Sequence, residues 1–215
     1  MNWQWSKLDR FSLISNSDSH SPHKIAREAN VFDTQMSYKA ILDALKKKDK
    51  NKFLSTIEFF PEEGKYHYDG HRLCEVRLSP IETKKNKNIC PKCGKPLTIG
   101  VMNRVTELAD RPEGFIPENS IPYKRMIPLA EIIADTLGVG DASKAVDAEY
   151  RAIVPRLGTE LEVLMEVSED KLLKELPIKI AKAIINVRNG NVNILPGFDG
   201  EYGQIEILKD KDSVG

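Results

Sequence analysis

This sequence is poor in the features that mark membrane and secreted proteins. No run of apolar residues approaches the roughly 18 that a membrane-spanning helix needs. The opening stretch, MNWQWSKLDR, has no basic flank followed by an apolar core, so it does not resemble a signal peptide. Only three cysteines are present, which argues against a framework of disulfides. We therefore expect a cytoplasmic protein without a membrane partner.

Two further absences narrow the classes of function. The chain contains no G-x-x-x-x-G-K-[ST] motif, so it is not itself a P-loop ATPase. Histidine is scarce, with four residues at positions 20, 23, 67 and 71. The remaining composition is that of a globular protein, with 40% hydrophobic and 30% charged residues, and 215 residues suffice for one large domain or two small ones.

The net charge is +0, but the charges are distributed unevenly. Residues 65–104 contain nine Lys and Arg against three acidic residues, a net charge of +6. Residues 131–170 contain three basic residues against ten acidic ones, a net charge of −7. A basic middle module is suited to a polyanion such as nucleic acid. The alternative is that both segments are solvated surfaces, and composition alone does not decide between the two.

The pattern of apolar residues predicts both strands and a helix in the first part of the chain. A continuous apolar run predicts a buried strand at 11–15, and a second strand is predicted at 53–60, ended by Pro61. Apolar residues at helical spacing predict a helix at 37–48. The lysine-rich run 46–52 is expected to be a solvated helix end and loop.

From about residue 105 the pattern is mainly helical. Glycines 138, 158 and 190 follow three helical segments, at positions where helices usually stop. The stretch NVNILPGFDGEYGQIEIL then predicts a strand, a glycine-rich turn and a second strand. The sequence therefore predicts an α+β fold with a mainly helical C-terminal region that ends in a short β-hairpin.

A metal site is predicted in the middle of the chain. His71 and Cys74 form one pair with x2 spacing, and fifteen residues later Cys90 and Cys93 form another. Two such pairs on tight turns close a tetrahedron in zinc ribbons, and thiolate and imidazole ligands favour zinc over magnesium or calcium. Because four protein ligands leave no open position, we expect a structural zinc ion in a small zinc-ribbon-like module.

The composition of residues 65–104 supports this prediction. The segment is short of aliphatic residues, so it can bury little apolar surface and needs the folding energy that a bound metal supplies. Three alternatives stay open from the residues alone. His67 competes as the fourth ligand; the cysteines could be unpaired structural residues beside a surface histidine; or the C-x-x-C pair could be redox-active.

Asp18 and His20 form an Asp-x-His motif just after the first predicted strand. If the chain is extended through both, their side chains share one face and could lean into the mouth of a β/α barrel. A carboxylate and an imidazole suit a Zn, Mn or Mg ion that activates water against a phosphodiester. Equally, Asp18 could cap a turn and His20 could be an exposed polar residue, and the motif alone does not decide.

Four segments, in this order and with this spacing, resemble the C-terminal half of the endonuclease Q family: LISNSDSHSPHKIAREANVF, TIEFFPEEGKYHYDGHRLC, CPKCGKPLTIGVMNRVTELADRP and LPGFDGEYG. The resemblance covers nearly the whole chain. It implies the remnant of a polymerase-and-histidinol-phosphatase (PHP) metallo-domain at 1–64, a zinc-binding module at 65–104 and a helical C-terminal domain at 105–215. It also implies a DNA-repair enzyme that nicks DNA on the 5′ side of deaminated bases, such as hypoxanthine and uracil, and at abasic sites.

The resemblance implies roles for particular residues. Asp18 and His20 correspond to the last metal-binding motif of the PHP barrel, a catalytic site for Mg, Mn or Zn, and the four predicted zinc ligands correspond to the zinc module. Enzymes that inspect a base commonly flip it into a pocket lined by stacking groups and hydrogen-bond donors. We expect DNA contacts from Tyr66, His67, Tyr68, Arg72, Lys92, Lys95 and Arg104.

The sequence also departs from the family pattern. The earlier PHP motifs, which carry most of the His, Asp and Glu ligands, are absent, as are most of the barrel strands. We therefore expect a remnant of the PHP β/α barrel that does not cleave DNA unaided, and a partner chain that supplies the N-terminal half of the barrel. Two alternatives stay open: a non-catalytic zinc-dependent DNA-binding module, and a helicase-associated accessory protein.

Overall fold

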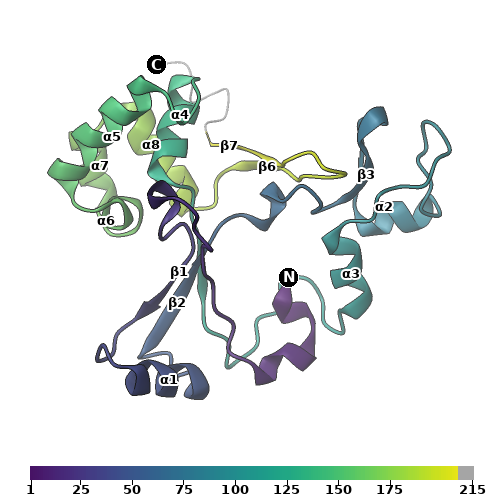
Figure 1. Cartoon of the computed structure of the whole chain (residues 1–215), viewed down its shortest axis with the longest axis horizontal. Coiled ribbons are helices and arrows are strands. Elements are labelled where there is room, and N and C mark those ends of the chain that lie inside the picture. Colours follow the sequence, from purple (N-terminus) through teal and green to yellow (C-terminus); the bar gives the residue numbers. More distant parts are fainter. Residues whose placement is uncertain (208–215) are drawn as a thin grey trace.

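The computed structural model describes residues 1–207 and has the mixed α+β architecture that the sequence predicts (Figure 1). The strands within these residues form three separate small sheets, of three, two and two strands, and close no barrel. Within residues 1–207, no helix is long enough and apolar enough to span a membrane. Short 3₁₀ turns connect the larger elements; they are η1 (Asn2–Gln4), η2 (Ser6–Arg10), η3 (Pro22–Lys24), η4 (Pro61–Glu63) and η5 (Arg72–Cys74).

The largest sheet joins distant parts of the chain. Its strands, in the order β1-β2-β5, are β1 (Ala29–Phe32), β2 (Phe53–Glu58) and β5 (Tyr123–Arg125). Strand β1 is antiparallel and β5 parallel to the central strand β2, which confirms the strand predicted from residue 53. The sheet therefore joins a strand of the first predicted domain, 1–64, to a strand of the third, 105–215. The predicted division into three domains stays a prediction.

The helix predicted at 37–48 is confirmed as α1 (Tyr38–Lys47). The hydroxyl of Ser37 accepts the backbone N–H of Ala40 and so caps the first turn. The helix ends at Lys48, which adopts a left-handed conformation with φ of +49°. Because the last turn is rich in lysine, its cations also complement the negative end of the helix dipole.

The strand predicted at 11–15 is wrong. The described structure assigns no strand there, and the side chains of Phe11 and Ile14 are 49% and 54% exposed. A single side chain takes the place of a neighbouring strand: Asn30 Oδ1 accepts the N–H of Ser15 at 3.0 Å, and Asn30 Nδ2 donates to the Ser15 carbonyl at 2.7 Å. An apolar run predicts a strand only where a partner strand can pair with it.

A small module surrounds a β-hairpin in the part of the chain predicted to bind zinc. Its elements are β3 (Asp69–His71), β4 (Val76–Leu78), α2 (Pro80–Lys85) and α3 (Val101–Leu108). The buried apolar side chains are few, namely Val76, Cys90 and Leu97. This core is as small as the composition predicts. The hairpin and the turn that carries Cys90 and Cys93 therefore need another source of stability.

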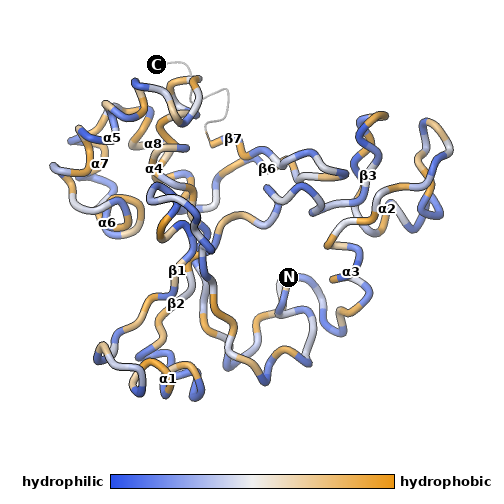
Figure 2. The backbone as a smooth tube through the Cα atoms, in the orientation of Figure 1, coloured by the Kyte–Doolittle hydropathy of each residue, from blue (hydrophilic) through white to orange (hydrophobic). Residues whose placement is uncertain are grey.

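Five helices form most of the main core (Figures 1 and 2). They are α4 (Leu129–Leu137), α5 (Lys144–Leu157), α6 (Glu160–Met165), α7 (Glu169–Glu175) and α8 (Ile178–Arg188). Hydrophobic positions recur between hydrophilic ones along these helices, and Ile132, Leu172 and Ile184 are fully buried. Gly138 and Gly158 follow α4 and α5 with φ of +66° and +115°, which confirms the predicted helix stops.

The predicted C-terminal hairpin is confirmed as β6 (Asn193–Leu195) paired antiparallel with β7 (Gln204–Glu206). Its glycine-rich turn, residues 196–203, reaches the start of the metal-site module. The N–H of Gly197 donates to the Glu62 carbonyl at 2.8 Å, and the N–H of Tyr68 donates to the Gly197 carbonyl at 2.9 Å. The turn therefore fastens the helical part of the chain to the module.

Candidate metal centre and nucleic-acid interface

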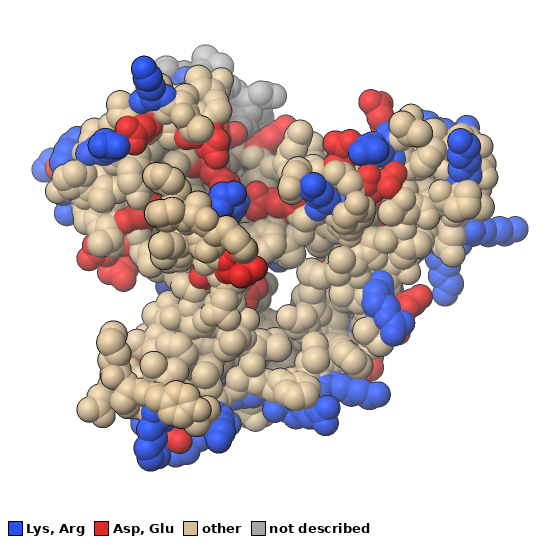
Figure 3. All heavy atoms as spheres, in the orientation of Figure 1, with Lys and Arg blue, Asp and Glu red and all other residues tan. Residues whose placement is uncertain are grey.

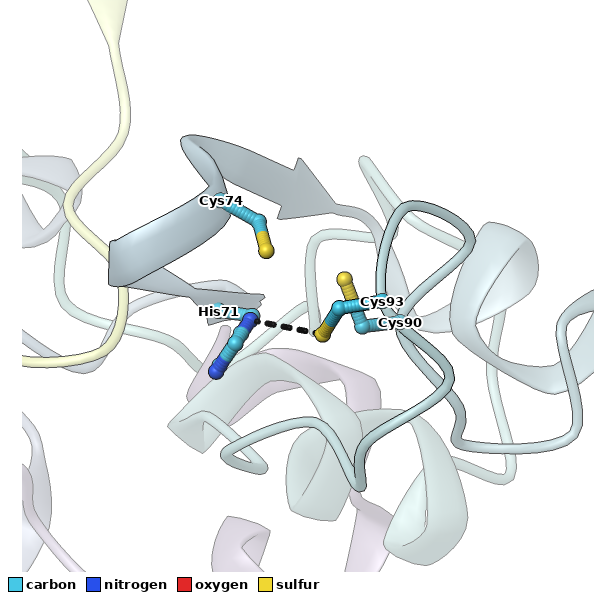
Figure 4. A group of neighbouring side chains, drawn as sticks. All are labelled: His71, Cys74, Cys90 and Cys93. Atoms are coloured by element: carbon cyan, nitrogen blue, oxygen red, sulfur yellow. Dashed lines mark hydrogen bonds between the residues drawn. The ribbon is translucent and has the colours of Figure 1, made fainter.

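The four predicted zinc ligands converge on one point. The ligand atoms of His71, Cys74, Cys90 and Cys93 lie within 4.8 Å of one another, and Figure 4 shows the three sulfurs turned toward the imidazole. Cys93 Sγ lies 3.4 Å from His71 Nδ1. Metal–ligand bonds of about 2.0–2.3 Å place the corners of a tetrahedron roughly 3.3–3.8 Å apart, so this donor set fits a tetrahedral ion. The four residues can therefore bind a metal ion.

Two tight turns present these ligands. The turn η5 carries Cys74 and ends at Glu75, whose φ is +51°. In the second turn the N–H of Gly94 donates to the Cys90 carbonyl at 2.9 Å, and Gly94 has a φ of +72° that favours glycine. The N–H of Cys90 in turn donates to the Lys95 carbonyl at 2.7 Å. Each turn brings ligands three residues apart to the same side of the backbone.

The sulfurs differ in how readily they ionise. Burial opposes ionisation of Cys90, but the backbone N–H groups of Cys93 and Lys92 lower its pKa to about 6. Burial, together with hydrogen bonds from Cys93 and Cys90, raises the pKa of Cys74 to about 11. Without a cation the cluster therefore cannot hold three thiolates at neutral pH, and binding of a metal ion must release protons.

Two aspartates, Asp69 buried and Asp199 partly buried, hold the module in shape, and the ligand pattern alone did not identify them. Asp69 is fully buried; its carboxylate accepts the N–H of Gly100 at 2.6 Å and the Asn103 amide at 2.7 Å. Asp199 accepts the N–H of Arg72 at 2.6 Å and the Thr98 hydroxyl at 2.6 Å. Both stand in Asp-Gly pairs of the sequence, which is the signal that could have indicated them.

His67 is not one of the converging ligands. Its side chain is 6% exposed and lines a separate cleft, and burial lowers its pKa while Glu62 opposes this effect. Among residues 1–207, the cluster of His71 and the three cysteines is the one group with metal-site geometry. The structure thus favours His71 over His67 as the fourth ligand.

Asp18 and His20 do not lie on an extended strand end. Both side chains are exposed, and Asp18 has a φ of +45°, in the left-handed region. The imidazole Nδ1 of His20 lies 2.8 Å from the Asp18 carbonyl oxygen, so the ring folds back on its own turn. The condition for a shared face is therefore not met, and no other candidate ligand joins the two within residues 1–207.

A cleft of about 810 Å³ separates the N-terminal turns from the first sheet. Its aromatic lining consists of Trp3, Phe11, Tyr68, Phe115 and Tyr123. Its floor contains charged groups: Arg125 Nη1 lies 3.3 Å from Glu62 Oε1, and Glu62 Oε2 has no hydrogen-bond partner. A planar ligand that stacks on aromatic rings matches this lining.

The residues predicted to contact DNA fall into three groups. His67 and Tyr68 line the cleft, whereas Tyr66 and Arg72 lie outside its lining, beside the 196–203 turn. Tyr66 is 52% exposed, so it is a surface residue and not a core residue. The remaining three predicted contacts are exposed on the module; they are Lys92, Lys95 and Arg104.

This chain is similar to a known family model and to two proteins. The family model of the MJ0043 C-terminal domain matches residues 128–191. The uncharacterized protein MJ0043 of Methanocaldococcus jannaschii is 37% identical over 95% of this chain, and the uncharacterized protein YqxK of Bacillus subtilis is 33% identical over 94% of it. This chain spans 26% of the first relative and 48% of the second.

Solved structures are similar over the whole chain. The lesion-specific endonuclease PfuEndoQ of Pyrococcus furiosus matches with a TM-score of 0.85 at 33% identity over 99% of this chain. The resemblance to endonuclease Q is confirmed. A second endonuclease Q structure, a complex with a 27-mer duplex substrate that has an abasic lesion at the active site, matches with a TM-score of 0.82 at 31% identity. This chain spans 55% and 54% of the two endonuclease Q chains.

Proposed function

We propose that this chain forms the C-terminal part of an endonuclease Q-like DNA-repair phosphodiesterase, which nicks DNA on the 5′ side of deaminated bases or abasic sites. The observation that supports this most strongly is the structural match to endonuclease Q over 99% of the chain, at a TM-score of 0.85. The second match covers 100% of the chain at 31% identity, so the Asp-x-His turn, the two ligand-bearing turns and the 196–203 turn all lie within the matched length.

In this proposal the metal centre of the module is structural and binds zinc. Three thiolates and one imidazole are the ligands zinc prefers, and they leave no coordination position for substrate. The module would then position Lys92, Lys95 and Arg104 against the DNA phosphates. Arg104 also pairs with Glu107 at 2.7 Å, so a phosphate must compete with that carboxylate.

The cleft is the proposed place for a displaced base. Its aromatic walls would stack against a flipped base. His67 and Tyr68 belong to this lining, which matches two of the predicted DNA contacts.

Nicking also requires a hydrolytic metal centre, and Asp18 and His20 would contribute two ligands to it. A catalytic divalent ion, Mg, Mn or Zn, supplies an activated water when bound, but it needs more than two protein ligands. We therefore propose that a PHP barrel half outside this sequence supplies the other ligands, and that residues 1–64 are the barrel remnant completed by it. In isolation this chain would bind lesion DNA without cleaving it.

The main alternative is a non-catalytic DNA-binding module, and one observation favours it. Asp18 and His20 are exposed and fold back on their own turn, and no third ligand approaches them within residues 1–207. Nothing in residues 1–207 favours the helicase-associated alternative in a comparable way.

A nicking assay separates these functions. Duplexes that contain uracil, hypoxanthine or an abasic site are incubated with Mn²⁺ or Mg²⁺ and the chain, alone or together with the N-terminal barrel half of an endonuclease Q. We expect nicking only in the mixture, and its loss in Asp18→Asn and His20→Asn. Nicking by the chain alone would refute its incompleteness. Binding without nicking in every mixture would establish the non-catalytic alternative, and no binding at all would contradict both.

A further inference from the structure

Two segments far apart in the sequence combine into one cationic surface. Six cations form it, and we call it the α1 basic surface: Lys7, Arg10, Lys46, Lys47, Lys48 and Lys50. Five of them are exposed and Lys48 is partly buried, and Figure 3 shows Lys and Arg gathered along the lower rim of the molecule, below α1 and the N-terminal turns. From its sequence, the lysine run 46–52 is expected to be a solvated helix end and loop; in the structure η2 lies against it, because Lys48 Nζ donates to the Asp9 carbonyl.

Backbone-directed contacts hold the two segments together. The hydroxyl of Ser12 donates to the Leu45 carbonyl at the end of α1, and Lys48 Nζ donates to the Asp9 carbonyl. Lys50 Nζ donates to the Glu118 carbonyl at 2.6 Å. Because Lys48 and Lys50 bind neutral carbonyls, no carboxylate cancels their charges in these contacts.

The nearby carboxylates are largely engaged elsewhere. Asp9 pairs with Arg111 at 2.5 Å, and Asp43 pairs with Lys39 at 2.8 Å. Both carboxyl groups accordingly have lowered pKa values, chiefly from hydrogen bonds with these partners. Two acids adjoin the surface without an ion pair among residues 1–207, Asp49 and Glu118. Six cations against these two give the surface a net charge of +4.

Two of the cations lie over aromatic rings. The Arg10 guanidinium carbon lies 4.6 Å from the centre of the Phe11 ring, and Lys7 Nζ lies 5.9 Å from the centre of the Trp5 ring. Such contacts restrict flexible side chains without neutralising them. Phe11 and Lys48 also line the 810 Å³ cleft, so the α1 basic surface forms one rim of it.

We infer that the α1 basic surface binds the phosphate backbone of duplex DNA on the side of the cleft next to α1, as a second contact separate from the metal-site module. The inference rests on the proposed function, which places a displaced base in the cleft. A row of cations with a net charge of +4 matches the evenly spaced negative charges of a duplex and reads no sequence. The DNA would then contact the chain on both sides of the cleft.

The test is the salt dependence of DNA binding by the full chain. Binding of a fluorescent duplex with one abasic site is measured between about 50 and 200 mM salt, a range over which each phosphate contact contributes about 0.9 to the slope of log K against log salt. The variant K46A/K47A and the variant K7A/R10A should each reduce the magnitude of this negative slope by about 2. Each should weaken binding to damaged and undamaged duplexes equally.

The matched control is K171A/K174A, which removes two exposed lysines from α7, and the slope should not change. A slope equal to that of the unaltered chain in both α1-surface variants would overturn the inference and leave the proposed function standing. An equal loss in the control would also overturn it, because any lysine pair would then suffice. If the unaltered chain binds no DNA, the proposed function fails first. Binding of the surface to anionic lipid vesicles, with no change of DNA slope in the variants, would assign it to a membrane instead.

Discussion

The carboxylate of Asp199 accepts the backbone N–H of Arg72, 127 positions earlier, at 2.6 Å. Arg72 is the first residue of η5, the turn that carries Cys74. The same carboxylate accepts the hydroxyl of Thr98, at the far side of the module. The turn of the C-terminal hairpin thus holds the first pair of metal ligands in place from outside the module.

Replacing Asp199 should therefore weaken metal binding without removing a ligand. In Asp199→Ala the Arg72 N–H and the Thr98 hydroxyl lose a charged partner, a loss of about 1–3 kcal/mol in the free energy of unfolding. We expect a lower melting temperature and faster loss of metal to a chelator. Asp141→Ala removes an exposed acid and serves as the control. Equal chelator kinetics in both variants would refute the positioning role.

Metal content tests the cluster itself. Purified protein should contain about one zinc ion per chain, as four-ligand structural sites do. Cys90→Ala combined with Cys93→Ala should lose the ion and destabilise residues 65–104, because their buried apolar core is so small. Elemental analysis and the temperature of unfolding measure the two effects. His67→Ala leaves the four converging ligands intact, and loss of zinc in that variant would contradict the ligand set.

A pH dependence is expected from Glu63. Burial and the nearby Glu131 carboxylate raise its pKa from the ordinary 4.5 to about 7. A carboxyl group whose pKa is raised on folding contributes stability at pH values below 4.5, and this contribution is lost as the pH rises through 7. Glu63→Gln should therefore raise the free energy of unfolding above that of the unaltered chain at pH 8, and by less at pH 5. The effect is at most about 1.4 kcal/mol per pKa unit, reduced by partial solvation. Unfolding by urea at both pH values measures it, and an equal effect of the substitution at pH 5 and pH 8 would contradict the assignment.

Close backbone packing of the hairpin turn predicts that replacing one glycine by alanine destabilises the fold, whereas replacing another does not. A Cβ at Gly203 would lie 2.1 Å from the Glu62 carbonyl oxygen, whereas a Cβ at Gly140 would meet nothing within 4 Å. Gly203→Ala should therefore cost about 1–3 kcal/mol through backbone displacement. Gly140→Ala should be close to neutral. Similar melting temperatures of the two variants would show that the turn does not pack against Glu62 as described.

Features that depend on neighbours along the chain could be predicted from the sequence. Helix α1, the glycine stops at 138 and 158 and the C-terminal hairpin all follow from capping, spacing and turn chemistry within a few residues. The metal cluster could be predicted for the same reason, since each pair of ligands lies on one turn. The strand predicted at 11–15 failed because its hydrogen bonds go to the side chain of Asn30, which a local pattern does not reveal.

The sequence by itself determined the two pairs of candidate metal ligands, helix α1 and the glycine stops after α4 and α5, because those properties depend on side-chain chemistry and short-range backbone hydrogen bonds. Only the tertiary structure decided that Asp199 supports η5, that Glu62 and Tyr123 line one cleft, and that Asp9 of η2 lies beside the end of α1. These relationships join residues tens of positions apart. Long-range packing of the sheet, the helices and the glycine-rich turn brings these residues together. The spacing of residues along the chain does not specify that packing.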